Sequence, residues 1–316
     1  MSLAQRVALP AALLGVVGLF GAIEPDTFLT SANAQNILGS QAVLVVVTMG
    51  LLLPLTAGDY DLSIAAVLTL SSVVVALLNV QQGWPVGWAV LTAVAAGAAA
   101  GFINGALVVL LDASSLVITL GSGTFILGLV LWISNSQTID GVSPSLVDPV
   151  ITWKLLGIPL AFFYGLALCI AMWYVLGFTA TGRRLLFTGR GRRVARLAGI
   201  RVGRARWGAF VASGAISAIA GVLYTGTNGG ADPSSGANFL LPAFAAAFLG
   251  ATSVEPGRFN AWGSLIAVYF LASGVTGLQL LGVASFVQQL FYGGALILAV
   301  AISRIAGGKA AAEGET

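Results

Sequence analysis

The chain has 316 residues, of which 58% are hydrophobic and only 8% are charged. Soluble domains carry roughly 25% charged residues, so this composition excludes a water-exposed globule. Histidine is absent and cysteine occurs once, at Cys169. This inventory excludes an intrachain disulfide, a His/Cys metal site and enzymes of the Ser-His-Asp, Cys-His or zinc type. We therefore expect an integral membrane protein with no catalytic residues, no metal and no cofactor.

Long apolar runs separated by short connections predict an all-α, polytopic membrane bundle. At about 20 residues per crossing, ten helices account for the runs. The expected spans are 8–24, 37–57, 62–80, 86–111, 115–135, 159–179, 207–226, 239–253, 260–281 and 284–303. The first lacks a small-residue cleavage site, so we interpret it as a retained helix rather than a signal peptide. The whole chain, 1–316, is then one membrane domain, with the bundle at 8–303 and a tail at 304–316.

The positive charges are concentrated in one connection. Nine of the 14 Lys and Arg residues lie between Arg183 and Arg206, and no acidic residue lies among them. The positive-inside tendency places this loop, 181–206, in the cytoplasm. Six spans before it and four after it put both termini on the same side, in agreement with Arg6, Arg304 and Lys309. Because apolar spans flank the basic run, we do not expect it to bind nucleic acid.

A pair of carboxylates stands between two apolar runs, in the sequence Gly58-Asp59-Tyr60-Asp61-Leu62-Ser63. A carboxylate at membrane depth is costly unless it has water, a partner or a break in the helix. One interpretation is a tight inner turn in which Asp61 or Ser63 caps the next helix. The other is a helix break on the side of a pore, with Gly58 supplying backbone freedom. The sequence leaves both open.

Two later spans contain further polar or small residues. Asn104 lies within a span and needs a hydrogen-bond partner, either a neighbouring helix or a substrate. Glycines at every fourth position permit close helix packing, and these are Gly97, Gly101 and Gly105. A small, polar stretch follows in the next span, at Thr119, Gly121, Ser122, Gly123 and Thr124. Its hydroxyls either line a conduit for a hydroxylated solute or bond to their own helix backbone.

The arginine-rich loop contains a candidate amphipathic helix, residues 192–200. Val194 and Leu197 fall on one side at helical spacing, and Gly199 is a stop signal. Such a helix either lies on anionic lipid or docks into a groove on a cytosolic partner. No phosphate-binding loop of the G-x-x-x-x-G-K-[ST] type occurs, so energy must come from another chain or from an ion gradient.

Four segments, in order, resemble the permease subunits of bacterial ATP-binding-cassette importers of the ribose and branched-chain amino acid type. Residues 58–64 resemble the family's G-G-I-D-L-S-V/I, and residues 117–122 resemble I-V-T-L-G-T. Residues 189–200 are similar to G-x-N-x-x-A-A-R-L-S-G-I. Residues 243–253, followed by Pro256-Gly257-Arg258, resemble A-I-A-A-V-V-I-G-G-T-S and its Gly/Arg-rich tail. Together the matches cover residues 40–300.

The resemblance assigns roles to particular residues. It implies that the ATPase is contacted by Gly189, Arg192, Arg193, Ala195, Arg196, Leu197, Gly199 and Ile200. The translocation path is then expected among Gly58, Asp59, Asp61, Ser63, Asn104, Thr119, Gly121, Ser122 and Thr124. The chain departs from the family at three points: Asp59 replaces a glycine, Arg192 and Arg193 stand where acidic residues are common, and Leu240 stands where an acidic residue is frequent.

The resemblance also implies the partners and the membrane. They are two cytosolic ATPase domains, an external substrate-binding protein (periplasmic or lipid-anchored) and a second permease copy, identical or paralogous, in the bacterial inner membrane. Because the spans offer Ser, Thr and Asn but no basic residue at mid-depth, we expect a monosaccharide such as ribose as substrate. The alternatives are a permease for branched-chain amino acids or nucleosides, or an ion-coupled secondary transporter that would use Asp59 and Asp61.

Overall fold

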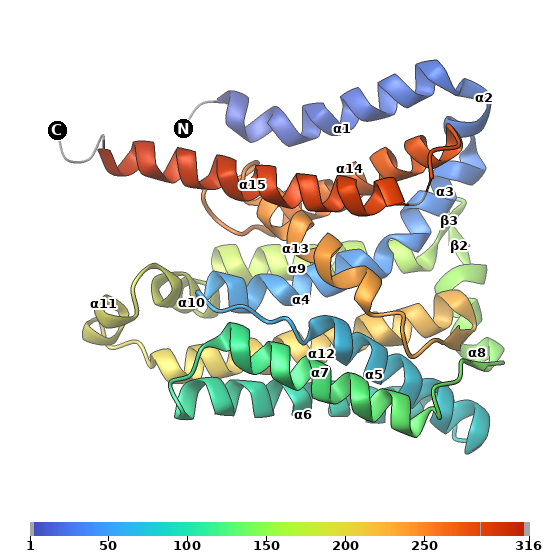
Figure 1. Cartoon of the computed structure of the whole chain (residues 1–316), viewed down its shortest axis with the longest axis horizontal. Helices are drawn as coiled ribbons and strands as arrows, with labels where there is room; N and C mark the ends of the chain where they lie inside the picture. Colours follow the sequence, from blue (N-terminus) through green and yellow to red (C-terminus); the bar gives the residue numbers. More distant parts are fainter. Residues whose placement is uncertain (1–2, 285, 313–316) are drawn as a thin grey trace.

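The computed structural model describes residues 3–284 and 286–312 and shows a bundle of helices that run along one common direction (Figure 1). The first half contains α1 Leu3–Ile23, α2 Pro25–Phe28, α3 Ser31–Ser40, α4 Ala42–Thr56, α5 Ile64–Ala76, a π-helical turn η1 Leu77–Gln81, α6 Val86–Leu110 and α7 Ser115–Ile133. The second half contains α8 Pro144–Val147, a π-helical turn η2 Asp148–Thr152, α9 Leu160–Phe178, α10 Ala180–Arg190, α11 Arg192–Leu197, α12 Val202–Asn228, α13 Ala237–Gly250, α14 Ala261–Leu280 and α15 Phe286–Ala312.

Four two-residue strands close the end of the bundle opposite α10 and α11. β1 Ile139–Asp140 pairs antiparallel with β4 Gly230–Ala231, in the register Ile139↔Ala231. This pairing ties the connection after α7 to the end of α12. β2 Lys154–Leu155 and β3 Ile158–Pro159 form a hairpin of their own between η2 and α9.

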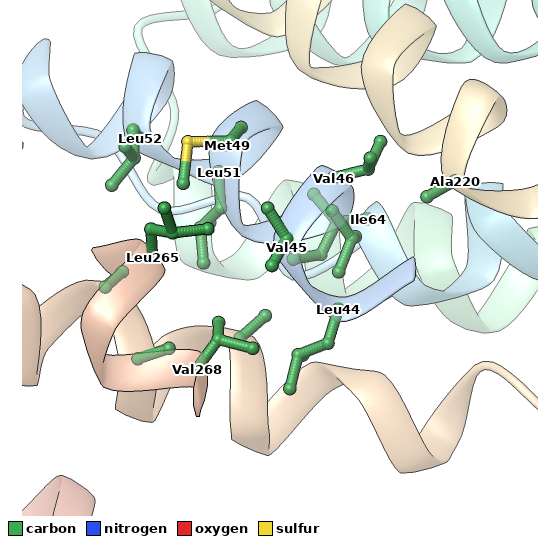
Figure 2. Close-up of a cluster of buried hydrophobic side chains, with 14 of the residues drawn as sticks. Leu44, Val45, Val46, Met49, Leu51, Leu52, Ile64, Ala220, Leu265 and Val268 are labelled. Carbon is green, nitrogen blue, oxygen red and sulfur yellow. The ribbon is translucent and has the colours of Figure 1, made fainter. Parts of the chain in front are cut away.

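The core of the bundle surrounds α4, which is buried along nearly its whole length. Aliphatic side chains of α4 pack against α14 on one side and reach toward α12 on the other, as Figure 2 shows for Leu44, Val46 and Val268. Helices that are apolar on all sides belong in the interior of a bundle or against lipid. The position of α4 explains why its sequence contains no charged residue.

The glycine repeat of α6 permits the close helix packing that the sequence predicted, and the structure identifies α12 as the partner helix. A Cβ atom at Gly101 would collide with the carbonyl oxygen of Phe210, and one at Gly105 would lie 2.6 Å from the Trp207 ring. From the other side, a Cβ at Gly214 would collide with the carbonyl oxygen of Gly97. The two backbones are therefore in direct contact, as small residues at every fourth position allow.

All ten predicted spans coincide with apolar helices. In the described chain, eight helices are long and apolar enough to cross a membrane, while α13 and residues 286–301 of α15 are shorter. The count of ten crossings therefore stays a prediction. Most boundaries differ by a few residues, but α12 begins at Val202 instead of 207, which brings two arginines inside the helix.

The first and last described helices share the end of the bundle at which the basic connection lies. Helix α1 begins and α15 ends at the end of the bundle that carries α10 and α11 (Figure 1). We call this the basic end. Helix α15 continues to Ala312, so most of the expected tail, 304–316, is helical, and residues 313–316 lie outside the described residues. The side chains of Arg304 and Lys309, which we used for topology, also lie outside them.

Candidate functional site

The segment between α4 and α5, residues 57–63, leaves helical geometry and turns its side chains to two different faces. Gly58 adopts φ +78°, a left-handed conformation that favours glycine. From there the side chains alternate: Asp59, Asp61 and Ser63 are buried, whereas Tyr60 is 42% exposed. We call this stretch the hinge segment. The segment is a turn between two helices in which Asp61 bonds to Ser63, the N-cap residue of α5, while a place beside a pore stays a prediction.

Asp59 is held inside the protein by two arginines. Arg206, in the first turns of α12, donates from Nε to Asp59 Oδ2 at 2.7 Å and from Nη2 to Oδ1 at 2.8 Å. Arg192, the first residue of α11, donates from Nη2 to Asp59 Oδ1 at 2.9 Å and to the Gly58 carbonyl at 3.3 Å. Bidentate pairing of this kind offsets the desolvation of a buried carboxylate. The hinge segment is thereby bonded to two other elements.

Asp61 has hydroxyl partners instead of cations. Its Oδ1 accepts from the Ser63 backbone N–H at 3.1 Å and from Ser63 Oγ at 2.6 Å. Its Oδ2 accepts from Ser213 Oγ of α12 at 2.8 Å. Asn104 of α6 donates from Nδ2 to Ser63 Oγ at 2.8 Å, so its amide nitrogen bonds to the hinge segment, whereas its buried Oδ1 has no partner among the described residues. This network joins α6, α12 and the hinge segment in the interior.

Helix α7 supplies the hydrogen bonds that the extended hinge backbone cannot make within a helix. Ser115 Oγ accepts from the Tyr60 N–H at 3.0 Å, and Thr119 Oγ1 accepts from the Leu62 N–H at 3.0 Å. Buried backbone groups need such partners. Among the predicted path residues of α7, Thr119 is therefore the one that contacts the hinge segment directly.

The other members of the polar stretch in α7 bond to their own helix. Ser122 Oγ donates to the Thr119 carbonyl at 3.3 Å, and Thr124 Oγ1 donates to the Leu120 carbonyl at 3.0 Å. Gly121 is exposed on the outside of the helix. Of the two sequence alternatives, hydroxyls bonded to their own helix backbone and hydroxyls lining a conduit, Ser122 and Thr124 show the hydrogen bonds of the first.

Helices α10 and α11 pack against the hinge segment through glycine. A Cβ at Gly189 would collide with the Thr56 carbonyl oxygen, and a Cβ at Gly58 would lie 3.2 Å from Gly189 Cα. Gly191 separates the two helices, so α11 runs from Arg192 to Leu197. The end of α10 thus lies directly on the end of α4, next to the Asp59 ion pairs.

The expected amphipathic helix is α11, and it presents its apolar side outward. Val194 is 71% and Leu197 83% exposed, while Ala195 is buried against the bundle. Gly199 ends the helix with φ +79°, as predicted from the sequence. Arg193 and Arg196 are exposed as well, and Ile200 is half-buried in the turn that leads to α12. The outward surface of α11 is therefore apolar in its centre and basic at its edges.

A cavity of about 460 Å³ lies on the opposite face of the hinge segment. Tyr60 and Leu62 of the hinge segment line it together with α7, α13 and α15. Three of its rings form a ladder: Tyr60 stacks on Phe244 at 6.4 Å between centroids, and Phe244 stacks on Phe248 at 6.5 Å. The carboxylates of Asp59 and Asp61 lie on the buried side of the segment and do not line this cavity.

The sequence analysis missed three participants: Arg206, Tyr60 and Phe244. Arg206 was counted among the loop arginines that report topology, yet it is 3% exposed and pairs with Asp59. Two features of the sequence could have identified this pair: Asp59 needs a cationic partner at membrane depth, and Arg206 directly precedes the expected span 207–226. Tyr60 and Phe244 carried no signal apart from their aromatic character, because 184 residues separate them in the chain.

Residues 33–300 match the family described as branched-chain amino acid transport system, permease component. The chain is 31% identical to the D-allose transport system permease protein of Escherichia coli over 92% of this chain and 89% of that protein. It is 33% identical to the ribose import permease protein of Bacillus subtilis, over 88% and 86%. It is 29% identical to the autoinducer 2 import system permease protein of Salmonella paratyphi A, over 95% and 91%. No solved structure matches the chain.

Proposed function

The chain belongs to the family of permease components of branched-chain amino acid transport systems, and on that premise we propose that it carries a monosaccharide across the inner membrane. As a member of this family it is a multi-pass transport subunit rather than an enzyme. ATP is hydrolysed by separate ATPase subunits, and an external binding protein delivers the substrate. A second permease copy, identical or paralogous, completes the transport path on this account.

The observation that carries the proposal is the two-sided hinge segment. On one side Asp59 bonds to Arg192 of α11, the helix with an exposed apolar surface suited to a partner groove. On the other side Tyr60, one residue further, forms the wall of an aromatic cavity. A displacement of α11 would therefore move Asp59, and through the peptide bond between Asp59 and Tyr60 it would also move the cavity wall.

We assign the basic end to the cytoplasm and the strand-bearing end to the outside. The excess of arginine in α10, α11 and the start of α12 supports this orientation, as does the lack of Lys and Arg, apart from Lys154, in the outer connections. Cysteine labelling tests it: Leu156→Cys should react with an impermeant maleimide in intact cells, and Leu197→Cys only after permeabilisation. The native Cys169 is buried and gives little background. The reverse pattern would refute the orientation.

In the mechanism we propose, the ATPases bind the exposed side chains of Val194 and Leu197 and move α11, which we call the coupling helix, relative to α12. Arg206 keeps Asp59 attached to α12, while Arg192 moves with the coupling helix. The resulting change in the hinge segment reorients Tyr60 and Leu62, which widens or narrows the cavity that they line. Coupling of this kind requires only that the ATPase binds the two positions of α11 with different affinity.

A monosaccharide suits the cavity because aromatic rings pack against the apolar face of a sugar. The relatives named for allose and ribose support this class of substrate. Cells that produce the complete importer should accumulate labelled allose or ribose in preference to leucine or adenosine. Preferential uptake of leucine or adenosine would overturn the sugar assignment and favour the amino acid or nucleoside alternative.

The role of α11 is tested by Leu197→Asp, which places a charge in the centre of the exposed apolar surface. We expect this variant to lose co-purification with the ATPase while it still inserts into the membrane. Leu156→Asp is the matched control, since Leu156 is 89% exposed at the other end of the bundle. Wild-type ATPase association of Leu197→Asp, or an equal loss in both variants, would refute this docking surface.

A further inference from the structure

A cleft separate from the aromatic cavity runs between α9 and α12, with Leu53 of α4 between them. Its volume is about 850 Å³. Along α12 it is lined from Arg204 to Ile216, which corresponds to a length of about 18 Å at 1.5 Å per helical residue. One leaflet of the hydrocarbon core is about 15 Å thick. The cleft therefore extends from the basic end into the membrane by the depth of one leaflet.

The lining of this cleft changes from basic to apolar along its length. Arg184, Arg201 and Arg204 stand at the basic end, and the deeper part is lined by small and aliphatic side chains, among them Gly208 and Met172. A Cβ at Gly208 would meet no atom within 4 Å, so the space beside α12 is open there. A charged mouth over an apolar channel matches a molecule with an anionic head and a hydrocarbon tail.

The three arginines at the mouth are available to a ligand. Their side chains form no ion pair or hydrogen bond with another residue in the described part of the chain, in contrast to Arg192 and Arg206. No acidic residue lines the cleft. Guanidinium groups bind phosphate oxygens through paired, charge-assisted hydrogen bonds. Basic pockets between helices at the cytoplasmic side of a membrane attract anionic lipid headgroups.

We propose that this cleft binds an anionic phospholipid of the inner leaflet. The phosphate lies on Arg184, Arg201 and Arg204, and one acyl chain lies along α12 past Gly208 toward Ile216. The leaflet rests on the proposed orientation of the bundle, whereas the binding itself does not. The lipid would pack α10 and α12 together next to the coupling helix.

The test counts lipid retained on the purified permease by native mass spectrometry in detergent, with phosphatidylglycerol and phosphatidylcholine as probes. We expect the wild-type protein to retain phosphatidylglycerol selectively. Arg184→Gln/Arg204→Gln should weaken retention by about tenfold or more, since each charge-assisted hydrogen bond is worth at least that factor. Arg190→Gln/Arg193→Gln removes the same charge outside the cleft and should retain the lipid.

A third variant distinguishes a whole lipid from a bare phosphate or an acidic protein surface. Gly208→Leu fills the channel without changing any charge, and it should also weaken phosphatidylglycerol retention. Unchanged retention in this variant, equal loss in the charge control, or equal binding of phosphatidylcholine would each overturn the proposal. The assay contains neither ATPase nor sugar, so its failure is separate from failure of the transport assignment. A reversed labelling pattern would change the leaflet only.

Discussion

The two faces of the hinge segment differ in chemistry although they belong to the same seven residues. The buried face carries the charge, and every carboxylate oxygen on it accepts a hydrogen bond from a named partner. The cavity face carries a tyrosine and a leucine and is open. Alternation along an extended backbone produces this division, since successive side chains point to opposite sides. A polar interior can thus position an apolar cavity wall without any carboxylate lining the cavity.

The two arginines that pair with Asp59 differ in burial and in the helix to which they belong. Arg206 is 3% exposed and belongs to α12, a central helix of the bundle. Arg192 is 40% exposed and belongs to α11, which projects from the basic end (Figure 1). The first contact is part of the folded core, and the second connects the core to the surface that we assign to the ATPase. Substitutions should separate these two functions.

The largest effect is expected for Arg206→Gln. Removal of the buried partner leaves Asp59 with the exposed Arg192 alone, and breaking a buried ion pair costs up to roughly 3–5 kcal/mol. We expect loss of monodisperse protein on size-exclusion chromatography and a large fall in Tm. The double variant Asp59→Asn/Arg206→Gln removes both charges and should recover most of the stability. Equal instability of the single and double variants would mean that the guanidinium packs rather than pairs.

The sequence predicted the helical bundle and the short helix α11 because both depend on local patterns. Apolar length, the glycine repeat of α6 and the stop at Gly199 are all visible within one element. The Asp59–Arg206 pair was not predictable in this way, because 147 residues separate its members. The early start of α12 has the same cause: an arginine inside a span looks unfavourable until its buried carboxylate partner is known.

The polar residues of the candidate path show a second limit of the sequence. Hydroxyls in a membrane helix satisfy themselves, as in Thr124, or support a neighbouring backbone, as in Thr119. Composition alone does not distinguish these cases, since both residues are threonines in the same helix. Contact with the hinge segment distinguishes them.

An intermediate effect is expected for Thr119→Val. This substitution keeps the side-chain shape but leaves the Leu62 N–H without its acceptor, at a cost of about 1–3 kcal/mol. We expect a lower Tm and slower sugar uptake, since the cavity wall loses its anchor to α7. Thr124→Val is the matched control and should leave both quantities nearly unchanged. A Tm for Thr119→Val equal to that of the control would show that the hinge segment does not depend on α7.

The smallest effect on stability, with a distinct effect on coupling, is expected for Arg192→Gln. Because Arg192 is 40% exposed and Arg206 still neutralises Asp59, the cost should be about 1 kcal/mol or less. The coupling helix nevertheless loses its ion pair to the hinge segment, so substrate-stimulated ATP hydrolysis in the reconstituted complex should fall while ATPase association persists. Arg190→Gln, at the end of α10 and without an ion pair in the described structure, is the control. If the Arg192→Gln and Arg190→Gln complexes show the same substrate-stimulated ATP hydrolysis, the ion pair fixes the position of α11 without transmitting its movement.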